Sequence, residues 1–166
     1  RYELHELIRQ FAAEHLAERL DEHIVTQARH ARYYLTAFSQ ADARLRSVAQ
    51  RETLDALSAE MDNFRAAWKW AVAHGEFAMI EQTLRVLAML YDTRGWLQEG
   101  LDTLGQAITA LETARDQSLP DRTDQIALGH LLTARAVLAT RLGQLEQAQA
   151  MLECSLDILR PLEEPR

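Results

Sequence analysis

The sequence is poor in residues that cross-link or interrupt a chain. Its 166 residues include one cysteine, three prolines and six glycines. A single cysteine, Cys154, excludes an internal disulfide framework and is typical of a reducing compartment, so we expect a cytoplasmic protein. The prolines at 120, 161 and 165 lie outside the strongly periodic stretches. Long helices are therefore not interrupted within those stretches.

Other absences exclude whole classes of protein. No run alternates apolar and polar residues as a half-buried strand does, and β-branched residues are sparse. No apolar stretch approaches the length that crosses a membrane, so we expect no membrane partner. Lysine and arginine number 18 against 25 acidic residues, for a net charge of −7, and no basic stripe is present. This balance argues against direct binding of nucleic acid.

Amphipathic helical patterns cover nearly all of the remaining sequence. Apolar residues recur at three- and four-residue spacing, and glycine or proline marks several of the ends. The second helix has no clear end between residues 40 and 48, and the last is expected to stop before Pro161. The pattern predicts helices over approximately residues 2–20, 21–40, 52–74, 77–93, 96–114, 124–142 and 144–159.

A helical hairpin pattern occurs twice, once around Gly95 and once around Gly143. Aligned on these glycines, which are 143 − 95 = 48 residues apart, the two segments share leucines and small residues at equal offsets. A small residue where two helices cross, with glycine at the tight turn, is what close antiparallel packing requires. Each glycine is expected to need a left-handed or tightly packed backbone. The matched pairs are Leu84 and Leu132, Ala88 and Ala136, Tyr91 and Ala139, Gly100 and Ala148, Leu104 and Leu152, and Ala107 and Ser155.

This hairpin pattern resembles the tetratricopeptide repeat, a helix–turn–helix unit that stacks into a solenoid. The spacing exceeds the usual ~34 residues, and the excess lies in the polar segment around Pro120. The fold class predicted is all-α, a right-handed tetratricopeptide-like solenoid of antiparallel helix pairs.

Two further stretches carry a second resemblance. Residues 2–12 read YELHELIRQFA, and residues 60–71 read EMDNFRAAWKWA, with RHARYYL upstream at 29–35. Together they resemble bacterial regulators of the STAND class of signal-transduction ATPases. In that class a nucleotide-binding domain and a winged helix precede tetratricopeptide-like repeats, often beside a DNA-binding domain. The resemblance implies that residues 1–20 are the terminal helix of a truncated winged-helix domain and residues 21–166 the repeat domain. The start at Arg1, without methionine, agrees with a fragment.

The same resemblance implies a role for His5 in the parent protein. Leu4-His5-Glu6 is similar to the Met-His-Asp motif of related ATPases, whose histidine touches the β-phosphate of ADP and helps to hold the off state. The alternative is an ordinary histidine on a helix surface. The phosphate-binding loop and its lysine are absent from this sequence. We therefore expect no cofactor in this chain, and ADP or ATP only in the parent protein.

The sequence offers no catalytic constellation and no convincing metal site. His15, His23 and His30 are seven or eight residues apart, which is two helical turns, or ~10 Å, too far for a shared zinc ion. Cys154 has no histidine near it in sequence and is expected to be a buried thiol. Trp68 lies on the apolar stripe of its helix, whereas Trp70 is expected on the opposite, more exposed side.

A binding surface is expected on the concave face, which the first helix of each pair builds. Its mixture of charge, amide and thioether suits a peptide or a small polar ligand, although a merely solvated face is the alternative. The function predicted is a non-catalytic sensor or protein-interaction module of a multidomain regulatory ATPase. It would bind an inducer, a partner protein or a neighbouring domain and so control an on/off switch. A freestanding repeat scaffold and an all-α enzyme are the alternatives. The candidate groove residues are Gln82, Arg85, Met89, His130, Thr133 and Arg135.

Overall fold

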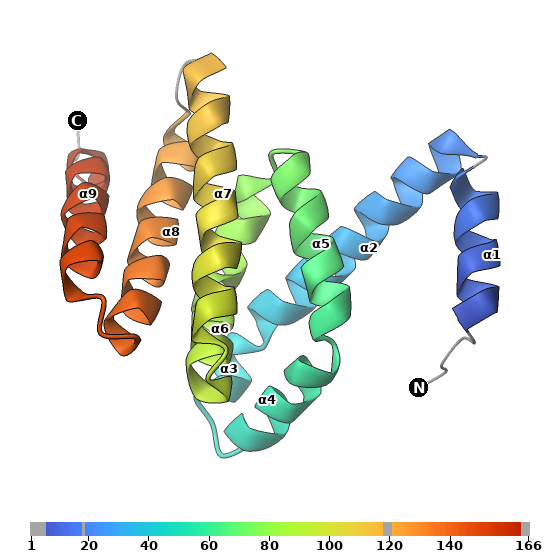
Figure 1. The fold of residues 1–166 in the computed structure, drawn as a ribbon, viewed down its shortest axis with the longest axis horizontal. Helices are drawn as coiled ribbons and strands as arrows, with labels where there is room; N and C mark the ends of the chain where they lie inside the picture. The colour runs from blue at the N-terminus through green and yellow to red at the C-terminus, as the bar shows by residue number, and fades with distance from the viewer. Residues whose placement is uncertain (1–5, 18, 118–120, 164–166) are drawn as a thin grey trace.

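The structure, a computed structural model, describes residues 6–17, 19–117 and 121–163 (Figure 1). Over these ranges every regular element is an α-helix, which confirms the all-α prediction. The helices are α1 (Glu6–Ala17), α2 (Leu20–Gln40), α3 (Asp42–Leu45), α4 (Gln50–Ala59), α5 (Met61–Ala73), α6 (Phe77–Arg94), α7 (Leu97–Gln117), α8 (Arg122–Arg141) and α9 (Leu145–Glu163).

Two helical hairpins, α6–α7 and α8–α9, turn at the predicted glycines. Gly95 has φ +71° and Gly143 has φ +76°, in the left-handed region that other residues adopt only with strain. In each turn the residue after the glycine donates its N–H to a carbonyl five residues earlier. These bonds join Trp96 to Tyr91 and Gln144 to Ala139, both at 3.0 Å, and they satisfy carbonyls at the end of the first helix. The predicted turns are confirmed.

Small residues lie where the second helix of each hairpin crosses its neighbours. Gly100 of α7 is buried, and a Cβ there would lie 2.5 Å from Leu138 Cδ1 and 2.9 Å from Tyr91 Cδ2. At the equivalent place in α9, Ala148 is 3% exposed. Ser155 is also buried, and its hydroxyl donates to the Gly129 carbonyl oxygen at 2.8 Å. The absence of bulk at these positions allows the helices to approach closely.

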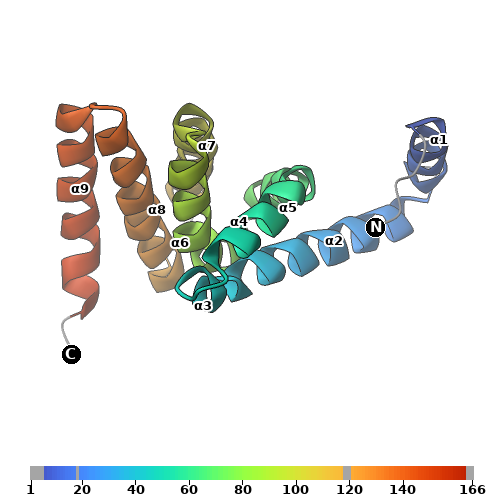
Figure 2. The ribbon, with the colours of Figure 1, turned by 90° about the horizontal axis from the view of Figure 1, so that it is seen from below.

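Helix α8 is central to the C-terminal half because it packs against α6, α7 and α9. Figures 1 and 2 show α6 to α9 as a row of helices, with α9 at its outer edge. Helix α2 packs against α5 and α6 with its C-terminal half and extends away from the row toward α1 (Figure 2). Phe38 of α2 stacks on Phe64 of α5, with ring centroids 4.1 Å apart. One apolar core therefore runs from α2 to α9.

The single helix predicted over residues 52–74 is wrong. The structure divides it at Glu60 (φ −106°, ψ 9°) into α4 and α5. Helix α4 packs against α3 and α6, whereas α5 packs against α2 and α7 as well as α6. The two halves thus share α6 but otherwise bury their apolar faces against different helices.

The predicted end of the last helix before Pro161 is also wrong, since α9 continues to Glu163 with Pro161 inside it. A proline lacks one N–H and cannot donate to the turn before it. In the final turn this loss concerns only one bond, so the helix tolerates it.

Candidate binding groove

A groove of about 580 Å³ lies between α6 and α8, the first helices of the two hairpins. Its residues recur at three- and four-residue spacing on both helices, so one side of each helix faces the groove. The lining consists of Glu81, Leu84, Arg85, Ala88, Met89, Asp92, His130, Thr133, Ala134 and Val137.

The floor of the groove is apolar. Leu84, Ala88 and Met89 line it from α6, and Ala134 and Val137 line it from α8. Val137 is 47% exposed, although it is a large hydrophobic residue. Since Val137 and Met89 are 137 − 89 = 48 residues apart, they occupy equivalent positions in the two hairpins. An apolar floor open to solvent is typical of a surface that binds a ligand or another protein.

Two polar contacts, the Glu81–His130 hydrogen bond and the Asp92–Arg141 ion pair, cross from α6 to α8 and mark the ends of the groove. His130 Nδ1 lies 2.7 Å from Glu81 Oε1, and Arg141 Nε lies 3.0 Å from Asp92 Oδ1. Glu81 and Asp92 are eleven residues apart, and so are His130 and Arg141, which is ~16 Å along a helix. Because both pairs join residues 49 positions apart, α6 and α8 run parallel.

The remaining charged residue of the groove, Arg85, is turned toward α3. Its Nη2 lies 3.0 Å from Asp42 Oδ1, and Asp42 also pairs with Arg46. The hydrogen bond from Arg46 holds the pKa of Asp42 below its ordinary value. The positive charges of Arg46 and Arg85 act in the same direction, whereas desolvation opposes them. Arg85 therefore lines the groove while its guanidinium is held beside a carboxylate that it shares with Arg46.

The structure brings four of the six predicted groove residues together. Arg85, Met89, His130 and Thr133 line the groove. Gln82 is exposed on α6 but lies outside the lining.

Arg135 lies elsewhere, at the contact between α8 and α7. Its guanidinium covers Gly105, where a Cβ would lie 3.1 Å from Nη2. Arg135 is two residues after Thr133, and such residues point to nearly opposite sides of a helix.

Sequence reasoning missed the apolar floor and both acidic ends. Glu81 and Asp92 could have been found from their spacing to His130 and Arg141, but only once α6 and α8 were known to be neighbours. Val137 carried a misleading signal, because an apolar residue on a helical stripe is ordinarily assigned to the core, whereas Ala134 lines the groove and belongs to the buried core as well. The groove is consequently more apolar than the mixed polar surface that the sequence predicts.

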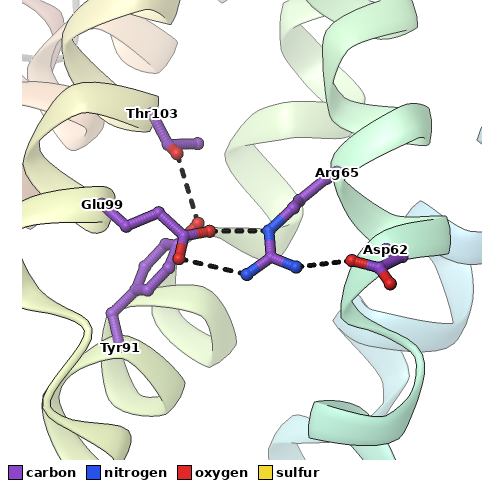
Figure 3. A network of polar contacts seen from close by, with 5 residues as sticks. All are labelled: Asp62, Arg65, Tyr91, Glu99 and Thr103. Carbon is purple, nitrogen blue, oxygen red and sulfur yellow. Dashed lines mark hydrogen bonds and ion pairs between the residues drawn. The ribbon is translucent and has the colours of Figure 1, made fainter.

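A second polar cluster joins α5, α6 and α7 and is shown in Figure 3. Arg65 Nε–H donates to Glu99 Oε1 (2.7 Å), and Nη2 donates to Glu99 Oε2 (3.1 Å). Nη1 of the same guanidinium donates to Asp62 Oδ1 at 2.7 Å. Behind this pair the fully buried Tyr91 hydroxyl lies 3.2 Å from Thr103 Oγ1. Each polar group in the cluster has a partner, so we interpret it as a clamp between helices rather than a site for a ligand.

The other predicted residues give no reactive centre. His5 lies outside the described residues. Cys154 is exposed, so the prediction of a buried thiol is wrong; the buried side of α9 carries Ala148 and Ser155 instead. Trp68 is buried as predicted. Trp70 is only half-buried and stacks on His74, with centroids 4.1 Å apart. In the part of the chain that the structure describes, no group of three or more His, Cys, Asp or Glu residues is placed to hold a metal ion.

None of the described helices is both long enough and apolar enough to cross a membrane. The fold and the groove together define an all-α protein of helical hairpins with an apolar groove between parallel helices. Compared with models of known protein families, with curated proteins and with solved structures, the chain gave no match.

Proposed function

We propose that this chain is a non-catalytic helical-repeat module that binds a peptide, a partner protein or a small-molecule inducer in the groove between α6 and α8. In this proposal α6–α7 and α8–α9 are two units of a right-handed tetratricopeptide-like solenoid. Three features support the repeat: equivalent left-handed turns, small residues at equivalent crossings, and parallel first helices.

We further propose that the module belongs to a multidomain bacterial regulatory ATPase of the STAND class. The support is the resemblance of residues 2–12, 29–35 and 60–71 to that class. A ligand shifts a switch only if it binds one state better than the other. The groove suits this role because each wall belongs to a different hairpin. A ligand that contacts both walls would favour one relative position of the two hairpins, and neighbouring domains would respond to that position.

The observation that carries the binding proposal is the apolar lining of the groove, where Val137 is exposed, between two polar contacts that bridge α6 and α8. Burial of apolar surface supplies free energy, and the charged ends supply orientation. Val137 is the best residue to change because its side chain is already half in solvent, so a charge there costs the fold little.

The test uses peptides of about 12 residues selected on the wild-type chain from a displayed random library. Val137→Glu should weaken the selected peptides by at least about tenfold, because it places a charge on the floor of the groove. Val48→Glu is the matched control, since Val48 is fully exposed and lies between α3 and α4. Circular dichroism verifies that both variants keep their helicity. Equal binding by wild type and Val137→Glu would contradict the groove as the site.

The regulatory context has its own test in the full-length gene. A phosphate-binding loop encoded upstream of Arg1 would support the ATPase assignment, and in that regulator Val137→Glu should change the response to inducer. A gene without such a loop would favour the freestanding scaffold.

A further inference from the structure

Helix α9 carries a stripe of leucines on its outer face. Leu145, Leu152 and Leu156 are 63%, 40% and 54% exposed. They are seven and four residues apart, so they lie on one face of the helix. Ala148 and Ser155 mark the face that is buried, and the leucine stripe lies beside it. Within the described ranges, Figure 2 shows no helix on the outer side of α9.

The internal repeat shows what covers the same stripe in the first hairpin. A shift of 48 residues takes Leu145, Leu152 and Leu156 to Leu97, Leu104 and Ile108 of α7. Leu104 is fully buried and Ile108 is 5% exposed.

Helix α8 is the element that buries them. Gly100 and Gly105 of α7 contact Leu138 and Arg135 of α8. At 100° per residue, Leu104 and Ile108 point between the directions of these two glycines. In this molecule, therefore, the helix that follows the hairpin, antiparallel to α7, covers this stripe.

The charge beside the stripe differs between the two hairpins. On α9 the stripe is bordered by Glu146, Glu153 and Asp157, and no ion pair joins these three to a basic residue in the described part of the chain. The equivalent residues of α7 are uncharged: Gln98, Gly105 and Thr109. Arg135 of α8 already covers Gly105. A basic residue in the place of Arg135 would thus meet Glu153 on α9.

We propose that the leucine stripe of α9 binds a basic amphipathic helix, which packs on α9 as α8 packs on α7. The helix presents apolar residues to Leu145, Leu152 and Leu156 and an arginine or lysine to Glu153. Where α7 has Gly100, α9 has Ala148, so the helix carries a small residue in the place of Leu138. This surface is separate from the groove between α6 and α8.

A synthetic peptide with the sequence of residues 122–141 and the change Leu138→Ala provides the probe. It contains three arginines and one aspartate, and it repeats the helix that covers α7. Fluorescence anisotropy measures its binding to the whole chain. The peptide should bind, and the same peptide with Arg135→Glu should bind at least about tenfold more weakly. Glu153→Arg in the chain should reverse this preference, which a merely hydrophobic contact would not do.

Three results would overturn the proposal. The first is no binding, or binding that survives the double change Leu152→Glu and Leu156→Glu. The second is loss of peptide binding in Val137→Glu, which would place the peptide in the groove between α6 and α8. The third is a dimer in sedimentation that Leu152→Glu dissociates, since a second copy of the chain would then cover the stripe. Circular dichroism of each variant confirms that its helices are retained.

Discussion

At the scale of single residues, Gly95 and Gly143 set the geometry of the two hairpins. Replacement of either by valine should lower the free energy of unfolding by ~1–3 kcal/mol, because a β-branched residue is strained at positive φ. The Cβ itself adds no crowding, since at either position it would meet no atom within 4 Å. The sequence suggests either a left-handed or a tightly packed backbone at these glycines, and the structure shows the left-handed one.

Gly95→Asn and Gly143→Asn are the matched controls, since asparagine tolerates the left-handed region. Urea unfolding should place each asparagine variant between the wild type and the corresponding valine variant. Valine variants that unfold at the wild-type urea concentration would show that the turns are not strained.

The buried Tyr91 should make stability depend on alkaline pH. Burial raises the pKa of Tyr91 above its ordinary value of 10.0, although the hydrogen bond with Thr103 acts in the opposite direction. In the unfolded chain the phenol ionises near pH ~10, so above that pH the folded state holds more protons than the unfolded state. The contribution is thus fully present below pH ~10 and is lost as the pH rises further.

Thermal unfolding between about pH 8 and pH 11 should show a steeper loss of stability for wild type than for Tyr91→Phe. Lys69, Cys154 and the other three tyrosines are present in both proteins, so the difference between the two pH profiles reports on Tyr91 alone. Parallel pH profiles for the two proteins would contradict the expected coupling.

At the scale of residues, the turns predicted from a backbone constraint at Gly95 and Gly143 are confirmed. The burial predicted for Cys154 from its apolar character is wrong. Glycine at a helix end has a specific conformational reason, so Gly95 and Gly143 were predictable. Cys154 was not, because a small thiol is equally compatible with a core and with a surface, and its exposure depends on which side of α9 meets α8.

At the scale of helices, two glycines of α7 should respond in opposite ways to alanine. Both gain helix propensity of up to ~1 kcal/mol. Gly105→Ala meets only the flexible end of Arg135, so it should be neutral or stabilising. Gly100→Ala collides with Leu138 and the buried ring of Tyr91, so overpacking should cost ~1–3 kcal/mol.

Chemical denaturation of both variants measures this difference. In the double variant Gly100→Ala with Leu138→Ala, the truncated Leu138 no longer collides with the new Cβ. The loss of stability in the double variant should therefore be smaller than the sum of the losses in the two single variants. Equal stability of Gly100→Ala and Gly105→Ala would mean that α7 does not approach α6 and α8 as closely as the structure shows.

The ends of helices were predictable only where a glycine interrupts the apolar periodicity of the sequence. Gly95 and Gly143 interrupt the apolar pattern, and α6 to α9 follow the predicted ranges closely at those ends. The stripe formed by Leu54, Leu57, Met61 and Phe64 continues without interruption through Glu60, although the helix does not. Periodicity reports that a residue is buried but not against which helix, so the division of α4 from α5 depends on tertiary contacts.

At the scale of the whole molecule, the groove follows from the order of the helices rather than from any motif. The repeat predicts that α6 and α8 are neighbours, and four of the proposed residues accordingly share one groove. The contacts of Glu81 with His130 and of Asp92 with Arg141 depend on the axial register of the two helices. The repeat spacing is 48 residues, whereas these contacts join residues 49 apart, so the repeat alone does not pair them. The equal spacing of eleven residues on the two helices is the signal that could have done so.

The whole chain should neither bind ADP measurably nor hydrolyse ATP. Tight binding of a nucleotide diphosphate needs a glycine-rich cradle of backbone N–H groups and a lysine beside it. The sequence has no such loop, and its sole lysine, Lys69, is exposed in the middle of α5. A net charge of −7 also repels the phosphates over long range.

Calorimetric titration with magnesium ADP and a phosphate-release assay with ATP measure the two activities. Weak binding that disappears with added salt, and persists in Lys69→Ala, would agree with this reasoning because it reflects general electrostatics. Micromolar affinity that resists salt would contradict it, and would show that these helices contain a nucleotide site of their own.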